Sequence, residues 1–353
     1  MMAYIMPWQN YNSMPFEDSF RNQIDLEQLN TFGVKVTAEC MIPISSEEGL
    51  QEVLKNTEGP FRILGGGSNI LFTQDVNGVL LKNEIKGMEV VERNGHWAIV
   101  KVGGGERWHD FVCWCLDQNL GGIENLSLIP GTVGAAPIQN IGAYGIELKD
   151  VFYKLSAIRL SDGRIRSFSP ADCTFDYRDS IFKKDFKGQY FITRVYIKLT
   201  SKDHQIRTRY GAIQDKLLEW EIQKPSIQDV SQAVIHIRKQ KLPDPEKLGN
   251  AGSFFKNPII PTRHFEQLKK RFPDIVHYPG GEGQIKVPAG WLVERCDWKG
   301  KRVGAVGCYE KQALVIVNYD NATGPEIWLH AQKVMKSVFE TFGVMLQPEV
   351  NVW

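Results

Sequence analysis

The 353-residue sequence lacks the features of a membrane-spanning, secreted or metal-binding protein. No stretch approaches the roughly 18 consecutive apolar residues of a transmembrane helix, and residues 1–8 lack a basic segment followed by an apolar core. The six cysteines show no C-x-x-C spacing, and neither they nor the seven histidines are spaced as metal ligands. We therefore expect a cytoplasmic protein without a metal site. Its cysteines should be reduced core residues, and its histidines surface or hydrogen-bonded core residues.

The sequence also lacks an excess of charge, because its formal net charge at pH 7 is +1. Nucleic-acid and bilayer partners usually require a basic excess in at least one segment, so we expect neither partner. Some basic side chains do bracket the Tyr210 loop and a predicted helix end. They either bind a diphosphate or form a solvated face. The residues are Arg207, Arg209, Arg238, Lys239 and Lys241.

Neither G-x-G-x-x-G nor G-x-x-x-x-G-K-[ST] occurs, which excludes the Rossmann and P-loop readings. A different glycine loop, Gly65-Gly66-Gly67-Ser68-Asn69, lies between residues 62–64 and 70–72, which we expect to be strands. Successive N–H groups exposed by glycine can bind a pyrophosphate without a lysine. A plain hairpin turn is the alternative interpretation.

A second segment of small residues, 121–145, is unusually long and low in charge. Glu124 is its only acidic or basic residue. Such a segment is expected to be buried or covered by a ligand, with its backbone hydrogen-bonded to something polar. A dinucleotide bound between this segment and the glycine loop would supply those polar partners.

Three further segments carry reactive side chains: Ser253 within Gly249–Pro258, Arg178 within 177–184, and Glu349 near the C-terminus. An alcohol, a guanidinium and a carboxylate suit a reaction in which negative charge grows on a substrate carboxylate or enolate and a proton is moved. Acyl transfer is disfavoured, because no G-x-S-x-G elbow is present. For the serine segment alone, a glycine-rich turn entering a strand remains the alternative.

Hydrophobic periodicity predicts helices and strands in both halves of the chain. A capping box at residues 45–48 is expected to open a helix through Lys55, giving a βαβ-like entry to a small mixed sheet. Further helices are expected at 108–115, 226–242 and 323–343. Strands are expected at 78–81, 88–91, 97–102, 157–160 and 190–199, and a last strand is expected to bring Glu349 back to the active site.

Several strings in order resemble the UDP-N-acetylenolpyruvoylglucosamine reductase family: ILGGGSNILF, IPGTVGAAPIQNIGAYG, YRDSIFK, KLPDP, GNAGSFFKNP, AGWL and QPEV. The resemblance runs from Asn30 to Glu349, and Tyr210-Gly211 places the chain with the longer subtype. It implies an α+β fold with a two-lobed FAD-binding domain of the vanillyl-alcohol oxidase (PCMH) type at 24–203. A C-terminal α/β substrate-binding domain would follow at 204–353, and residues 1–23 would form a lead-in without an implied role.

The resemblance also implies an activity, in which NADPH as co-substrate reduces non-covalently bound FAD and UDP-N-acetylglucosamine enolpyruvate is then reduced to UDP-N-acetylmuramate for peptidoglycan synthesis in the bacterial cytoplasm. Ser253 would deliver a proton, while Arg178 and Glu349 would polarise the substrate carboxylate. A monomer is expected. The implied substrate contacts are Tyr210, Lys241, Asn257 and Gln312. The implied FAD contacts are Gly65, Gly66, Gly67, Ser68, Asn69, Pro130, Gly131, Gly134, Ala135, Pro137, Ile138, Gln139, Asn140, Gly142, Ala143, Tyr144 and Arg238.

The chain departs from the family pattern at Asn351, where many members carry arginine, so one minor cofactor contact is expected to be missing. An FAD-dependent sugar or alcohol oxidase of the same fold is the alternative function. Such oxidases often tether FAD through His or Cys, and neither residue occurs in the two flavin segments. A non-enzymatic binding module would not need Ser253, Arg178 and Glu349 together.

Overall fold

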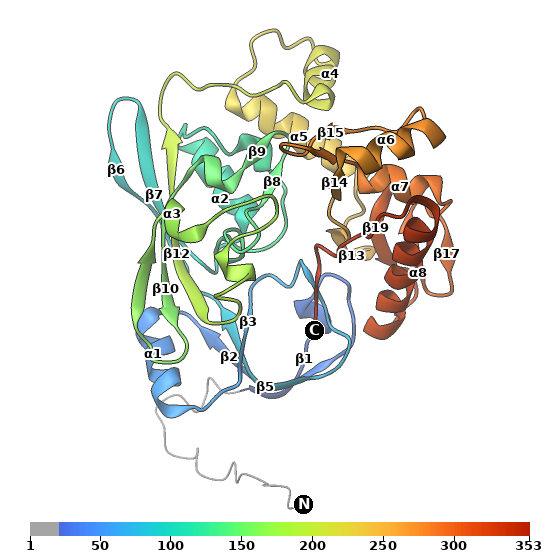
Figure 1. Ribbon diagram of the computed structural model, residues 1–353. Coiled ribbons are helices and arrows are strands. Elements are labelled where there is room, and N and C mark those ends of the chain that lie inside the picture. The colour runs from blue at the N-terminus through green and yellow to red at the C-terminus, as the bar shows by residue number, and fades with distance from the viewer. Residues whose placement is uncertain (1–20) are drawn as a thin grey trace, which may run out of the picture.

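A computed structural model describes residues 21–353, so most of the expected lead-in at 1–23 lies outside the described residues. The first described strand, β1 (Arg21–Asp25), already belongs to a sheet. Two bodies of strands and helices lie side by side, with the blue and green elements on the left and the orange and red elements on the right (Figure 1). No helix within residues 21–353 is both long and apolar enough to cross a membrane.

The first sheet has the order β1-β2-β5-β3, and β2 and β3 are connected through a helix as the βαβ pattern predicts. Strands β2 (Thr37–Ile44) and β3 (Phe61–Leu64) both run parallel to β5 (Val76–Asn83) between them, with α1 (Glu47–Asn56) in the connection. The predicted capping box is wrong by one residue. Ser46 caps α1 by accepting a hydrogen bond from Gly49 N at 2.9 Å, and a glycine at that position has no side chain to complete the box.

The second sheet is antiparallel in the order β11-β10-β12-β7-β6. Each predicted strand is present, and β10 starts five residues earlier than expected. The bounds are β6 (Met88–Arg93), β7 (Trp97–Gly103), β10 (Phe152–Arg159), β11 (Ile165–Phe168) and β12 (Tyr190–Thr200). Helices α2 (Trp108–Asp117) and α3 (Pro170–Cys173) share its apolar core.

The cysteine prediction holds for four residues and fails for two. Cys113 is exposed and Cys296 is partly exposed, while the other four are buried, and all six are free thiols. The reason for Cys113 is helical geometry. The buried stripe of α2 runs through Trp108, Val112 and Cys115, and the residue next to Val112 turns outward.

The segment between α2 and β10 folds mainly into turns and 3-10 helices. It contains η3 (Glu124–Leu126), η4 (Val133–Ala135), the short pair β8 (Gly142–Ala143) and β9 (Ile146–Glu147), and η5 (Leu148–Asp150). Within 121–145 only Pro130 and Gly145 are exposed, which confirms the predicted burial. Two more 3-10 helices lie elsewhere, η2 (Glu27–Leu29) and η6 (Ile181–Lys183).

Helices α4 (Gly211–Glu219) and α5 (Ile227–Lys241) pack on each other and stand at the top of the view in Figure 1. A capping box on Ser226 starts α5, as predicted. The α5 helix contacts η3, where Ser231 Oγ lies 2.8 Å from Ser127 Oγ. This helix pair therefore joins the glycine-rich segment, and the domain boundary at residue 204 stays a prediction.

The C-terminal core surrounds the sheet β13-β19-β18-β17, a smaller sheet β14-β16-β15 and three helices. The strands are β13 (Gly249–Ser253), β14 (Ile259–Pro261), β15 (Tyr278–Pro279), β16 (Gln284–Lys286), β17 (Arg302–Val303), β18 (Val306–Tyr309) and β19 (Gln312–Asn318), and the helices are α6 (Thr262–Arg271), α7 (Ala289–Arg295) and α8 (Gly324–Phe342). The stripe predicted for α8 is buried, a capping box on Thr323 starts the helix, and Gly343 ends it with φ of 65°.

The end of the chain crosses back to the first body, where the red segment reaches the blue sheet (Figure 1). Strand β20 (Asn351–Val352) pairs in parallel with β4 (Ile70–Leu71), directly after the glycine loop. Thr73 N donates to Trp353 O at 2.7 Å, and the Trp353 ring meets Phe72 edge to face. Glu349 is thus brought back to the first body, as predicted, because Asn351 and Val352 pair with β4.

Candidate active site

The glycine loop Gly65–Asn69 lies against the second glycine-rich segment at backbone distance. A Cβ added to Gly66 would lie 2.9 Å from Gly131 Cα, and one added to Gly131 would lie 2.8 Å from Ser68 Oγ. Gly67 adopts φ of 65°, a conformation that favours glycine. The two segments predicted to hold one dinucleotide are therefore adjacent, and only glycine allows their close approach.

The loop presents unused hydrogen-bond donors. The backbone N–H groups of Gly66, Gly67 and Ser68 donate to no acceptor within residues 21–353. Thr132 Oγ1, which a Cβ on Gly65 would approach to 2.6 Å, is likewise buried without a partner in this part of the chain. The Lys82 ammonium donates to Gly65 O, a nearby cation that sequence reasoning missed. Free N–H groups beside a cation suit a pyrophosphate.

The side chain of Asn140 is fully engaged by the protein. Its Nδ2 donates to Glu147 Oε2 and Asp176 O, both at 3.0 Å, and its Oδ1 accepts from Lys149 N at 3.0 Å. Gly134 N likewise donates to Gly104 O at 2.8 Å. These residues shape the segment by bonding to protein, so any contact of Asn140 with a cofactor is left to its backbone.

Asn69 links the glycine loop to the C-terminal return. Its Nδ2 donates to Gln139 Oε1 and, at 3.3 Å, to Glu349 O. Asn351, the residue that departs from the family pattern, donates through Nδ2 to Asn69 O at 2.9 Å. An asparagine here thus supports the glycine loop from the protein side.

Arg178 and Glu349 form an ion pair, with 3.0 Å between Nε and Oε1. Arg178 has φ of 53°, and its Nη2 donates to Gly142 O. A Cβ on Gly142 would lie 2.9 Å from Nη1, so the glycine makes room for the guanidinium. Both side chains are about one-fifth exposed, at 20% and 18%. Arg178 therefore keeps Nη1 available for a ligand carboxylate.

Ser253 ends β13 at a register irregularity opposite Val315, and a β-bulge of this kind re-aims a side chain. Its hydroxyl forms no hydrogen bond with the described residues, although Ser253 is half-buried. The next residue, Phe254, is fully buried and accepts a hydrogen bond from Glu349 N at 2.8 Å through its carbonyl. The predicted serine, arginine and carboxylate thus belong to one connected set of segments.

Asn257 is also held in this set. Its Oδ1 accepts from Ala289 N at 2.9 Å, and Asn257 lies beside the Tyr177 phenol and favours its charged form. Burial raises the pKa of the Tyr177 phenol, while the nearby Arg178 opposes that shift. Lys286 Nζ lies 4.2 Å from the centre of the Tyr177 ring. Sequence reasoning noted Tyr177 only as a neighbour of Arg178, and the tyrosine in YRDSIFK was the available signal.

Tyr144, Tyr210 and Arg238 form a separate cluster at α4 and α5. The two tyrosine rings meet edge to face at 5.2 Å, and Tyr210 is 53% exposed. Arg238 Nε is buried without a partner in the described residues, and burial lowers the pKa of this guanidinium. A buried cationic side chain with an unused donor fits an anionic ligand group.

The remaining predicted substrate residues stand apart. Lys241 is exposed at the end of α5, and Gln312 begins β19, where its Oε1 accepts from Leu314 N at 3.4 Å. No hydrogen bond or ion pair within residues 21–353 joins either of them, or Tyr210, to Ser253. Only a ligand that spans both bodies would bring these groups together.

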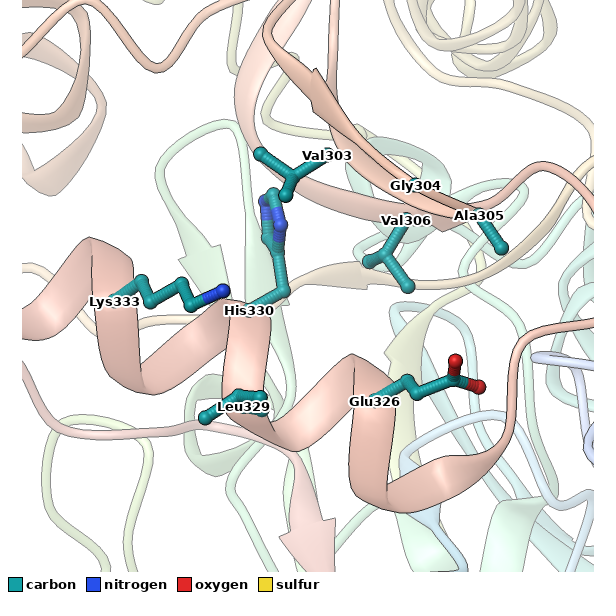
Figure 2. A pocket seen from close by; sticks show the side chains of 8 residues that line it. All are labelled: Val303, Gly304, Ala305, Val306, Glu326, Leu329, His330 and Lys333. Carbon is teal, nitrogen blue, oxygen red and sulfur yellow. The ribbon is translucent and has the colours of Figure 1, made fainter.

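Two of the cavities in the described residues lie in different parts of the fold. One, of about 290 Å³, lies beside Glu349 and is lined by Asp179, Lys183, Lys184, Lys187, Lys256 and 348–351. The other, of about 180 Å³, lies between α8 and the hairpin of β17 and β18 (Figure 2). It contains none of the predicted site residues. Its His330 is 3% exposed, with Nδ1 unpartnered in the described region, so the expected hydrogen-bonding of a core histidine is incomplete.

No group of three or more His, Cys, Asp or Glu side chains in the described part of the chain could hold a metal ion. The fold and the paired glycine segments instead define an FAD-binding protein of mixed α and β structure. A family model described as an FAD binding domain matches residues 38–169. A second model, the C-terminal domain of UDP-N-acetylenolpyruvoylglucosamine reductase, matches residues 244–353.

Similar proteins agree along nearly the whole chain. The UDP-N-acetylenolpyruvoylglucosamine reductase of Flavobacterium johnsoniae is 48% identical over 94% of this chain and 99% of its own, and that of Amoebophilus asiaticus is 47% identical over 94% and 98%. The chain belongs to the UDP-N-acetylenolpyruvoylglucosamine reductase family. The crystal structure of the Thermus caldophilus member has a TM-score of 0.64 at 24% identity, covering 95% of this chain and 99% of that one. The predicted α+β class, with an FAD-binding and a C-terminal domain, is confirmed.

Proposed function

We propose that this chain reduces UDP-N-acetylenolpyruvoylglucosamine to UDP-N-acetylmuramate, with FAD as cofactor and NADPH as co-substrate. The observation that carries the proposal is the connection of Ser253, Glu349 and Arg178 to the glycine loop. Glu349 N bonds the residue after Ser253, Glu349 Oε1 pairs with Arg178, and Glu349 O accepts from Asn69. Family membership along nearly the full length supports the same reaction.

The cofactor site is proposed from donors that the protein leaves unused. The N–H groups of Gly66, Gly67 and Ser68 would hold the pyrophosphate of FAD, and Arg238 with Tyr144 would supply a second anchor. FAD, when bound there, supplies hydride transfer. Residues 24–203 are proposed as the FAD-binding domain and 204–353 as the substrate-binding domain.

The protein's own part in the reaction is to hold charge and move one proton. Arg178 Nη1 would bind the enolpyruvyl carboxylate, where negative charge grows as the double bond is reduced. Ser253 Oγ, free of protein hydrogen bonds, would donate its proton to the carbon beside that carboxylate. General acid catalysis of this kind contributes roughly two to four orders of magnitude in rate. Phe254 and Phe255, buried at 0% and 1% exposure, fix the backbone that carries the serine.

The nucleotide part of the substrate is assigned to the second set of residues. Tyr210 and Lys241 would contact the diphosphate from α4 and α5, while Asn257 and Gln312 would contact the sugar nucleotide from the C-terminal body. Binding across both bodies explains why no protein contact joins these groups to Ser253. The proposed setting is the bacterial cytoplasm, where the chain would act as a monomer.

The test is anaerobic oxidation of NADPH with and without the enolpyruvyl substrate, followed in the purified, FAD-loaded protein. Rapid flavin reduction by NADPH and reoxidation by the substrate are expected. Ser253→Ala should keep the first half-reaction and slow the second by at least about a hundredfold. Ser167→Ala, at an exposed strand position, is the matched control. Equal loss in both halves would contradict the role of Ser253, and turnover that requires dioxygen would favour the sugar or alcohol oxidase.

A further inference from the structure

The segment that connects β12 to α4, residues 201–210, has little structure of its own, and we term it the connector. Residues 204–209 belong to no helix or strand, and the backbone of 202–209 forms no backbone–backbone hydrogen bond in the described part of the chain. Its last residue, Tyr210, is the N-cap of α4 and is 53% exposed. The connector leads to α4 at the top of the view in Figure 1. Contacts with other parts of the fold must therefore fix the position of Tyr210.

A buried amide reaches the connector from the glycine-rich segment. Asn125, in the middle of η3, is 1% exposed. Its Nδ2 donates to Arg207 O at 2.9 Å and to Tyr144 O at 3.1 Å. The partners fix the orientation of this amide, because the reverse orientation would place Oδ1 against two carbonyl oxygens. One side chain thus joins the connector to the segment that is proposed to hold FAD.

The two hydrogen bonds hold the backbone on both sides of a pair of aromatic rings. Tyr144 has φ of 51°, which is uncommon for a residue with a side chain, and the bond to its carbonyl stabilises that conformation. The Tyr144 ring meets the Tyr210 ring at 5.2 Å with an interplanar angle of 80°. Arg207, whose carbonyl accepts the other bond, lies three residues before Tyr210. The Asn125 amide therefore constrains both partners of the ring pair.

The other contacts of the connector are exposed, apolar or close to its start. Arg207 Nη1 lies 3.6 Å from Asp150, but these side chains are 53% and 32% exposed, so solvent weakens the ion pair. Ile206 packs against the core of the second sheet and that of α4 and α5. His204 Nδ1 lies 2.6 Å from a hydroxyl at the end of β12. Within the described residues, Asn125 is the one buried side chain that hydrogen-bonds to the connector backbone.

Resting on the proposed function, we propose that Asn125 is a positioning residue that holds Tyr210 against Tyr144, where Tyr210 contacts the diphosphate of the substrate. Water does not compete for hydrogen bonds of a buried amide, so they hold the connector more firmly than an exposed ion pair does. A Tyr210 that is already in place costs less ordering when the substrate binds. No hydrogen bond within residues 21–353 joins Asn125 to Ser253, so its effect belongs to substrate binding and not to the proton transfer.

The experiment follows reoxidation of the reduced flavin at increasing concentrations of the enolpyruvyl substrate, which gives an apparent Kd and a limiting rate. Asn125→Asp keeps the shape of the side chain but turns an oxygen toward both carbonyls. Asn125→Ser removes the amide without adding a charge. Both changes should raise the Kd by roughly 5- to 50-fold and leave the limiting rate within about twofold. Asn77→Asp, at an exposed position of β5, is the matched control and should equal the wild type.

Two further measurements locate the effect. In a Tyr210→Ala background, Asn125→Asp should raise the Kd by less than about twofold, because the ring that Asn125 positions is already gone. Trypsin cleavage reports on the connector itself, since Arg207 and Arg209 are both exposed. Cleavage after these two residues should be at least about fivefold faster in Asn125→Ser than in the wild type. The protease assay does not require substrate, so it tests the hydrogen bonds independently of activity.

Equal FAD content and equal thermal stability of the variants exclude general damage to the fold. A wild-type Kd in both Asn125 variants, or effects of Asn125→Asp and Tyr210→Ala that multiply, would overturn the inference and leave the proposed function standing. A lower limiting rate at unchanged Kd would also overturn it, because Asn125 would then act on the chemical step. Failure of the substrate to reoxidise the wild-type flavin would instead overturn both proposals.

Discussion

Replacing Gly66 by alanine is predicted to weaken FAD binding without unfolding the protein. The added Cβ would lie 2.9 Å from Gly131 Cα and 3.3 Å from Gly131 C, both backbone atoms. Ordinary van der Waals contact begins at 3.4 Å, so the two segments must separate by at least about 0.5 Å. Neither segment can rotate a side chain away, because both contacts are to backbone.

The separation would misalign the N–H groups that face the proposed pyrophosphate. A hydrogen bond to a charged group contributes about 1.5–3 kcal/mol, so losing one should raise the Kd for FAD by roughly 10- to 150-fold. Titration of the FAD-free protein with FAD, followed by flavin fluorescence, measures this constant. Gly95→Ala is the matched control, because a Cβ there meets nothing within 4 Å.

The control should bind FAD with wild-type affinity. A Gly66→Ala protein that also bound FAD with wild-type affinity would refute the reasoning, because the close approach would then have no bearing on the cofactor. Thermal unfolding of the FAD-free proteins separates the two effects. A large loss of stability in Gly66→Ala alone would show that the contact serves the fold and not the ligand.

Three other predictions concern single side chains. Arg178→Lys should lower kcat/KM for the enolpyruvyl substrate by roughly 10- to 100-fold at unchanged FAD content, because an ammonium cannot serve Glu349 and Gly142 O together. Thr323→Ala should lower the free energy of unfolding by about 1 kcal/mol in urea titrations, because it removes the capping box with Glu326. Burial, with lesser effects of nearby lysines, lowers the pKa of His330 to about 4, so the unfolded chain takes up the proton first on acidification. Stability should therefore fall by at most about 3 kcal/mol between pH 6.5 and pH 4, and His330→Leu should show a smaller fall in the same titration.

Helices and their ends were predicted well where the signal lies in residues that are close together in the sequence. The stripe at Ile327, Ala331, Val334 and Val338 required only helical periodicity, and the cap at Thr323 required only its neighbours. The capping box predicted at Ser45 was wrong, although Glu48 follows three residues later as the pattern requires. The N-cap is Ser46, which Gly49 follows three residues later, so the sequence pattern did not locate the first residue of the helix.

The candidate site could be predicted in part. The glycine loop, the long segment of low charge and the serine segment each stand out in composition, because close backbone approach requires small residues. The sequence could not predict that the Asn140 side chain hydrogen-bonds to Glu147 and Lys149, since its partners depend on how the segment turns. The cavity beside Glu349 was missed for the same reason. Lys183 and Lys256 are far apart in sequence and become neighbours only in the fold.

The sequence by itself determined the family and the α+β class. It also determined which residues could supply backbone N–H groups for an anion, a proton donor and a guanidinium. These depend on residue type and on spacing along the chain. Only the tertiary structure decided that Glu349 pairs with Arg178, that Asn69 meets the C-terminal return, and that His330 lies buried with an unused nitrogen. Each of these depends on strands such as β4 and β20, which lie at opposite ends of the chain and pair only when the whole chain has folded.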